Sequence, residues 1–299
     1  MFVAVISTDS SGNVGSWNIA GFNSTGLRID SCYIPYQCSY DSTEQNSPSG
    51  NTFLYTGRNT TPGSWSTHGA PPTSGRVGVL SHIAAGGGWT TVMTLVNNSS
   101  SAPPLTIAFH TETGTPLTLP LTVTSQGVSQ TNTTNTTSSI NATINPKATL
   151  QISTGDGMSS TVVGWADVFS LGTLGGFAIF RQTPQNGSPS EGTVPLQTTY
   201  PNTITLPYDN AGFVTGVALA NLSTSAMVTA TVWDEAGNQL ITQNLAIIGN
   251  GHMSFVLPNQ LLLTAGKRGI VQFQNSGGLA GLGLRFSPFG TFTSVPTLY

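Results

Sequence analysis

The sequence has very little charge. Asp, Glu, Lys and Arg make up 6% of its 299 residues, against about 25% in an ordinary soluble domain. Lys and Arg together number eight, the net charge is −3, and nucleic acids and anionic membranes are therefore not expected as partners. Because charge normally keeps protein surfaces apart, we expect either a coat of sugar or burial of much of the surface in an assembly.

Long apolar runs and helical periodicity are missing as well. No apolar run approaches the ~20 residues that a membrane-spanning helix needs, so no membrane insertion is expected. No stretch shows a convincing period of 3.6 residues. Hydrophobic residues still make up 37% of the chain, which is not the composition of a disordered protein. Short apolar or alternating stretches, separated by Gly, Pro, Asn and Ser, predict an all-β protein.

Motifs that carry catalysis are also lacking. The chain has no Gly-x-Ser-x-Gly elbow, no phosphate loop and no dinucleotide fingerprint. The four histidines, His68, His82, His110 and His252, are scattered without metal-ligand spacing. His82 and His110 could approach each other in a sandwich, but we expect each histidine to be simply packed or solvated. Asp156 and the pair Asp234-Glu235 lie in predicted turns, where Asp is favoured for backbone reasons. We predict no enzyme, no catalytic or metal site and no cofactor.

The chain does contain an internal repeat. Residues 88–101 read GWTTVMTLVNNSSS and align without a gap to residues 212–225, GFVTGVALANLSTS. A predicted hairpin follows in each copy, from 105–110 to 117–123 and from 228–233 to 240–247, which aligns Phe109 with Trp233 and Leu117 with Leu240. Strands of this length and spacing predict two tandem β-sandwich domains, Ig-like or jelly-roll-like, at 78–197 and 198–299. A Ser/Thr/Asn-rich surface insertion is expected at 122–145.

Residues 1–77 have no copy elsewhere and form a non-repeated N-terminal β segment. Its first strand, residues 2–6, is apolar on both faces; further strands are expected at 17–22, 28–36 and 52–55, before a Pro/Gly/Ser/Thr-rich linker. Cys32 and Cys38 are the only cysteines, and an even count favours a disulfide worth about 2–3 kcal/mol. Two free thiols or a metal pair are the alternatives, and a metal pair would need further ligands nearby.

The repeated motifs resemble a known family. The stretch GGGWTT at 86–91 followed by LVN at 95–97, GLRF at 283–286 and the closing Val-Pro are similar to a tandem β-sandwich repeat. That repeat occurs in large secreted proteins of environmental bacteria, notably acidobacteria. The resemblance covers about residues 78–297. It implies the sandwich fold and an extracellular or cell-surface location, and the family has no assigned activity.

Glycosylation sequons are frequent. Asn-x-Ser/Thr triplets occur at Asn23, Asn59, Asn97, Asn98, Asn132, Asn135, Asn141 and Asn221. A chain so rich in Ser, Thr and Asn also produces such triplets by chance. The strongest candidates lie in the 122–145 insertion. Asn97 and Asn221 recur at the same point of both repeats, which is first explained by the tolerance of Asn for turn conformations.

Two hypotheses of function follow. The first is a structural subunit of an extracellular, glycosylated filament, a homopolymer in which copies of the chain add head-to-tail by β-strand addition; its subunit-contact candidates are Phe2, Val3, Val5 and Ile6. The alternative is a secreted adhesin or carbohydrate-binding module, since aromatic side chains stack on sugars and several lie in predicted loops: Trp17, Tyr33, Tyr36, Tyr40 and Trp65. A glycan-acting hydrolase is a less favoured third class.

Overall fold

The computed structural model describes residues 75–299 except 125–132, Asp156 and 185–187, together with the backbone of three strands near the N-terminus. The chain divides into two compact units, Met1–Ala70 and Pro71–Tyr299. Strands dominate the described part of the chain. The only helices in the described part are two short turns, α1 (Leu257–Gln260) and the 3₁₀ helix η1 (Leu262–Thr264), and the predicted all-β fold is confirmed.

The first unit contains a small antiparallel sheet in the order β1-β2-β3. Its strands are β1 (Phe2–Thr8), β2 (Val14–Phe22) and β3 (Arg28–Ser31). β1 pairs with β2 along its whole length and lies at the edge of the sheet. The predicted first strand is therefore present, with one of its two edges already hydrogen-bonded within the unit.

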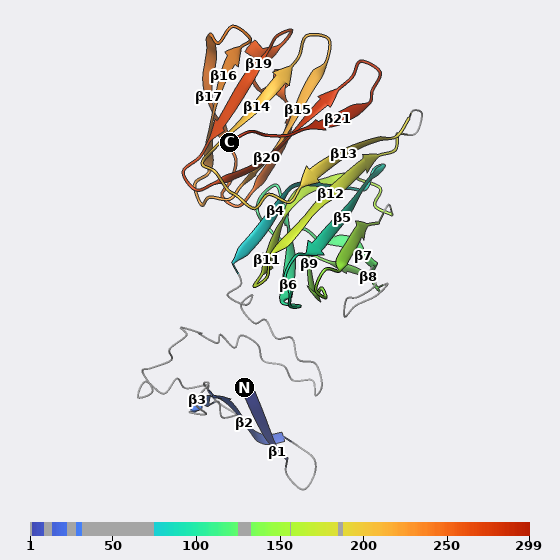
Figure 1. Cartoon of the computed structure of the whole chain (residues 1–299), viewed down its shortest axis with the longest axis vertical. Helices are drawn as coiled ribbons and strands as arrows, with labels where there is room; N and C mark the ends of the chain where they lie inside the picture. The colour runs from blue at the N-terminus through green and yellow to red at the C-terminus, as the bar shows by residue number, and fades with distance from the viewer. Residues whose placement is uncertain are drawn as a thin grey trace. The chain divides into compact units, whose positions relative to one another are not determined.

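The second unit holds four antiparallel sheets, two for each repeat (Figure 1). In the first repeat, sheet 1a has the order β13-β12-β5-β10-β7-β8 and sheet 1b the order β4-β11-β6-β9. The strands of the first repeat are β4 (Arg76–Ala85), β5 (Trp89–Asn97), β6 (Pro104–Thr111), β7 (Leu119–Thr124), β8 (Thr133–Thr137), β9 (Ser139–Thr143), β10 (Thr149–Thr154), β11 (Val162–Ser170), β12 (Leu174–Gln182) and β13 (Ser190–Pro195).

In the second repeat, sheet 2a has the order β18-β15-β20-β21 and sheet 2b the order β14-β19-β16-β17. Its strands are β14 (Thr203–Asp209), β15 (Val214–Asn221), β16 (Met227–Asp234), β17 (Gln239–Ala246), β18 (His252–Val256), β19 (Arg268–Gln274), β20 (Leu279–Phe286) and β21 (Phe292–Val295). Sheets 1a and 2a therefore correspond to each other, as do 1b and 2b. The last strand of each repeat returns to the first one through a single bridge, Val79 to Gln197 and Thr205 to Leu298.

Alternating side chains build the core of each sandwich. In β6, for example, Leu105, Ile107 and Phe109 are buried while the residues between them are partly exposed. The equivalent strand β16 buries Val228, Ala230 and Val232 in the same way. Period-two burial is the expected pattern for a sheet with one face on the core.

The predicted first hairpin is wrong. β6 lies in sheet 1b and β7 in sheet 1a, and after the turn at Gly114 only one isolated bridge joins the two segments. β7 instead pairs with β10. The predicted second hairpin, β16–β17, is confirmed. The strand of the first repeat that matches β17 is thus β9, which pairs with β6, and the alignment of Leu117 with Leu240 is wrong.

The 122–145 segment is only partly a surface insertion. β8 extends the edge of sheet 1a. β9 instead belongs to the sandwich itself: its Ile140 and Ala142 point into the core, and so does Ile144, just after its end. The polar residues that surround these three side chains concealed a strand that alternates between core and solvent. The extra material in the first repeat is therefore the β7–β8 pair.

Candidate functional site

The site that the structure defines is the contact between the two repeats. Sheet 2a packs across β11 and β4 of sheet 1b and reaches β13, whose neighbour across the contact is β21. Its outward residues Ala218, Leu282 and Leu284 are buried in one cluster with the core of the first repeat. The faces that meet are unlike, 1b on one side and 2a on the other, so the contact is heterologous.

Trp165 of β11 is at the centre of this contact. Its side chain is fully buried and packs with Val79, Ala220 and Ala280. Its indole ring stacks on His110 with 4.4 Å between ring centroids, and its Nε1–H donates to the carbonyl of Asn250 at 3.1 Å. A large side chain over two alanines fills the space between the sheets, and the hydrogen bond satisfies the one polar atom that the indole would otherwise bury.

A turn of the second repeat fits beside a turn of the first. Asn250 has a φ of 57°, and two residues later the N–H of His252 donates to the carbonyl of Glu112 at 3.0 Å. A Cβ on Gly114 would lie 2.8 Å from the Asn250 carbonyl oxygen. Close approach of the two backbones therefore requires glycine at this position, which also has a φ of 74°.

Two buried histidines face each other across the contact. Nδ1 of His82 lies 3.2 Å from Nε2 of His252, and their rings stack at 5.3 Å. Burial lowers the pKa of His82 to about 4. Burial, followed by the proximity of His82, places the pKa of His252 well below its usual value. Both rings are therefore neutral at pH 7, and one donates a hydrogen bond to the other. Sequence reasoning considered a pair of His82 with His110 and missed the pair with His252. The two residues are 170 positions apart, and the packing of one repeat on the other was not predicted.

Aromatic side chains extend the contact at the β21 end. Phe292 stacks on both Trp89 and Phe180, with centroid distances of 5.7 and 5.5 Å. Trp89 follows three glycines with positive φ, Gly86, Gly87 and Gly88. These glycines turn the chain tightly into β5, and the aromatic residue that follows them contributes to the contact between the repeats.

Asn97 and Asn221 occupy the same place in the two repeats and are both fully buried. The Nδ2 of Asn97 donates to the carbonyls of Ser101 and Ile144 at 2.7 and 2.8 Å. The Nδ2 of Asn221 donates to the carbonyls of Ser225 and Ile247 at 2.6 and 2.9 Å. In each case Oδ1 accepts from the N–H two residues on. These side chains fasten the loop after the strand to the opposite sheet.

That network corrects two predictions. Neither asparagine has a positive φ, so tolerance of a turn conformation is not the reason for their recurrence. Their Nδ2 atoms are buried and hydrogen-bonded, and in the folded protein they are not available to a glycan. Asn98, Asn135 and Asn141 are exposed and remain candidate glycosylation sites. Asn23, Asn59 and Asn132 lie outside the described residues.

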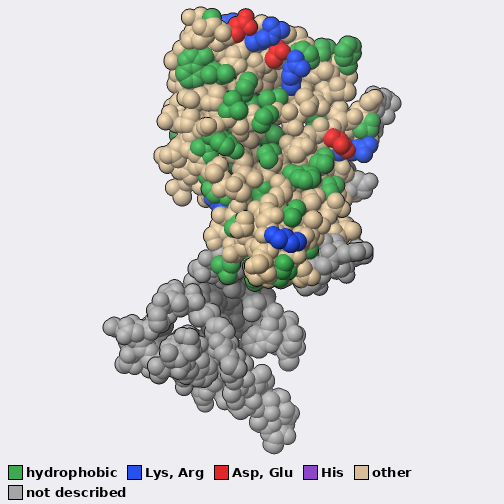
Figure 2. All heavy atoms as spheres, in the orientation of Figure 1, with side chains coloured by type: hydrophobic (Ala, Val, Ile, Leu, Met, Phe, Trp, Pro, Cys, Tyr) green, Lys and Arg blue, Asp and Glu red, His purple; other side chains and the backbone are tan. Residues whose placement is uncertain are grey.

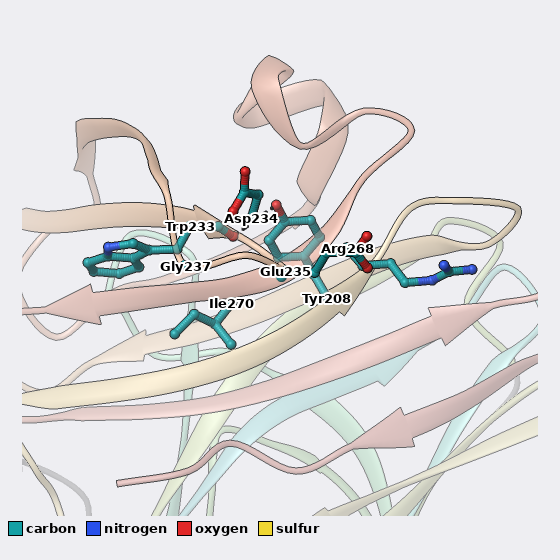
Figure 3. A pocket seen from close by; sticks show the side chains of 8 residues that line it. Tyr208, Trp233, Asp234, Glu235, Gly237, Arg268 and Ile270 are labelled. Atoms are coloured by element: carbon teal, nitrogen blue, oxygen red, sulfur yellow. Dashed lines mark hydrogen bonds between the residues drawn. The ribbon is translucent and has the colours of Figure 1, made fainter.

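A hollow with a volume of about 560 Å³ lies on the outer face of sheet 2b (Figure 3). Trp233 and Ile270 form its apolar part, and Glu235 and Arg268 lie at its margin. Strand pairing places Trp233 and Ile270 opposite each other, at the positions that His110 and Trp165 occupy in sheet 1b. Trp233 therefore matches His110, and its predicted match with Phe109 is wrong: Phe109 faces the core.

Other predicted residues are placed as follows. Cys32 and Cys38 lie outside the described residues, as do Asp156, His68, Tyr33, Tyr36, Tyr40 and Trp65. Phe2, Val3, Val5 and Ile6 lie in β1 and Trp17 in β2, where the backbone alone is described. Asp234 is a turn residue, as predicted: its carboxylate accepts from the N–H groups of Ala236 and Asn238.

No three His, Cys, Asp or Glu residues in the described ranges come together as a metal site. None of the helices found there is long and apolar enough to cross a membrane. Comparison of the chain with protein-family models, with curated proteins and with solved structures finds no match.

Proposed function

We propose that this protein is a structural subunit of an extracellular assembly built from copies of itself. The observation that supports the proposal is the contact between the repeats. Two versions of one sandwich already stack through unlike faces, and a heterologous contact of that kind, when it is repeated between molecules, generates an open chain instead of a closed dimer.

The surface supports the same role. Few charged side chains lie on the face shown in Figure 2, where hydrophobic side chains are scattered among uncharged side chains and backbone. On β16 and β17 of sheet 2b, neutral polar side chains form two hydrogen-bonded pairs across the strands, Thr229 with Asn244 and Thr231 with Thr242. A neutral surface of this kind opposes association only weakly, since like charges on neighbouring molecules are scarce.

Strand addition by β1 is the first contact to test. β1 is an edge strand, and its unpaired edge is able to extend a sheet of another copy. The full chain is examined by negative-stain electron microscopy and sedimentation over a wide concentration range, beside a variant that lacks residues 1–8. We expect filaments from the full chain and folded monomers from the variant. A full chain that stays monomeric at every concentration contradicts the proposed function, whereas filaments from the variant reject strand addition alone.

A carbohydrate-binding module is the second candidate, and the half-buried Trp233 at the hollow favours it. Sugar rings stack on such a side chain, and Glu235 and Arg268 at the margin would hydrogen-bond to hydroxyl groups. The test is binding of the monomer to a glycan array, with Trp233→Ala as the matched control. Binding that the substitution abolishes would favour this candidate, and no binding would leave the structural role as the better account.

A further inference from the structure

We propose that the contact between the two repeats is repeated between molecules, with sheet 1a of one copy packing on sheet 2b of the next. This inference rests on the proposed function and deepens it by naming the two faces and the occupant of each. Sheet 1a corresponds to 2a, and sheet 2b corresponds to 1b. Each end of the double sandwich thus presents the counterpart of a face that is already buried inside the chain.

The first of these faces is apolar where its counterpart is buried. Leu282 and Leu284 of sheet 2a pack against the first repeat and are 1% and 9% exposed. Both β20 and β12 begin opposite the buried asparagine of the neighbouring strand, and counting along from there places Phe177 and Ile179 at the same positions of sheet 1a. Phe177 is 39% exposed and Ile179 is half-buried. Two apolar side chains thus lie on the open face of sheet 1a, at positions whose counterparts in sheet 2a are covered by the first repeat.

The second face is apolar in the same sense. Ile270 of sheet 2b takes the place of Trp165 and is 39% exposed. Leu298 takes the place of Gln197 beside the first strand of the repeat and is 53% exposed. Ile270 and Trp233 line the hollow described above, whereas the matching Trp165 is covered in the first repeat.

Side-chain size is exchanged between the two partners. Inside the chain, the large Trp165 packs over the small Ala220. At the ends, the smaller Ile270 takes the place of Trp165, and the larger Val96 takes the place of Ala220. Ala280, the other alanine beneath Trp165, is matched by the smaller Gly175, so Val96 offsets part of the volume that is lost at Ile270.

Charge is complementary at the corresponding turn. Lys147 has a φ of 62° and Asn250 a φ of 57°, and both precede the strand that pairs with the first long strand of their sheet. Asn250 packs beside the turn that contains Glu112 and Gly114. The matching turn of the second repeat contains Glu235 and Gly237. The predicted contact between copies therefore places Lys147 beside Glu235, one of few acidic side chains on this surface.

The experiment uses two full-length variants, each with one face disabled. Phe177→Asp carries a damaged sheet 1a and an intact 2b; Ile270→Asp carries the reverse. Both residues are exposed, so circular dichroism and thermal unfolding should match the parent chain. We expect each junction between copies to need the face contact as well as strand addition by β1. Neither variant should therefore form filaments alone, and an equimolar mixture should form dimers and nothing longer, because each copy offers one working face.

The outcomes separate the alternatives. If the parent chain forms filaments and both variants still do so, the face contact is wrong while the proposed function stands. If Phe177→Asp alone prevents assembly, like faces meet and the head-to-tail contact is wrong. If the parent chain itself does not assemble, the proposed function fails.

A charge exchange provides a second measurement on surface residues that cannot affect the core. Lys147→Glu and Glu235→Lys should each raise the concentration needed for assembly about 10-fold, and the double variant should return it to the parent value. Equal loss in the double variant would overturn the pairing of these two residues.

Discussion

The two repeats share a skeleton and differ in what covers it. In both, a buried asparagine at the end of the first long strand of sheet a ties a loop to the opposite sheet, and a closing strand returns to the first one. Sheet 1b is covered by the second repeat, whereas the matching sheet 2b is open. The residues that the two repeats share, such as the buried asparagines, therefore determine the fold. The residues that differ at matching outward positions determine what each sheet face contacts.

The largest effect should come from matching substitutions at the two faces. Trp165→Ala removes a fully buried ring and a hydrogen bond from the contact and should cost about 3–5 kcal/mol of unfolding free energy. Ile270→Ala at the matching open position should cost the monomer less than about 1 kcal/mol. Urea unfolding followed by circular dichroism measures both. Equal costs would mean that the contact between repeats contributes nothing to stability.

Acid should weaken the covered face next. The pKa of His82 is about 4 in the folded protein, against 6.5 for an unperturbed histidine, so the unfolded chain binds more protons between these two pH values. The free energy of unfolding therefore has its full value above pH 6.5 and falls as the pH approaches 4, by about 3 kcal/mol for this group. Unfolding free energy measured from pH 7.5 to 4 should show this slope, and the variant in which His82 and His252 are both replaced by Gln should lose most of it.

The shared skeleton should respond alike in both repeats. Asn97→Ala and Asn221→Ala each leave buried carbonyls without a donor and should cost about 2–3 kcal/mol. The Nδ2 of Asn275 also donates to Oδ1 of Asn221 at 3.0 Å, so the second substitution should cost slightly more. Asn98→Ala, next to the first site and exposed, is the control and should change stability by less than about 0.5 kcal/mol. A negligible cost for both buried asparagines would refute the network.

The smallest effect on stability concerns glycans. If the chain is exported in a host that attaches N-linked sugars, peptide mapping by mass spectrometry should find them at Asn98, Asn135 or Asn141 and at neither Asn97 nor Asn221. Sugar on Asn97 would show that modification precedes folding and that the buried network does not form.

Sequence reasoning predicted the repeated skeleton well. The strand in each copy of the repeat (β5 and β15) and the turn at Asp234 depend on local signals, and the structure contains each of them. It failed where the same local pattern is compatible with two pairings: β7 follows a turn after β6, but it pairs with β10 in sheet 1a and not with β6 in sheet 1b. Local pattern specifies a strand and does not specify its neighbour.

The contact between the repeats could not be predicted for a related reason. Ala220 and Ala280 are small residues without a distinctive pattern in their strands, and their role in the contact is evident only from their packing with Trp165. His82 and His252 likewise show no motif spacing. Contacts between sheets that are far apart in the sequence depend on how whole sandwiches pack. The periodicity of a single strand contains no information about that packing.

A reconstruction of the assembled native chain by electron cryo-microscopy tests the central claim most directly. The predicted result is a contact between copies that superimposes on the contact between repeats, with Ile270 beneath sheet 1a of the next copy and Lys147 beside Glu235. Filaments in which Phe177 and Ile270 both face solvent, with copies joined through other surfaces, would contradict it.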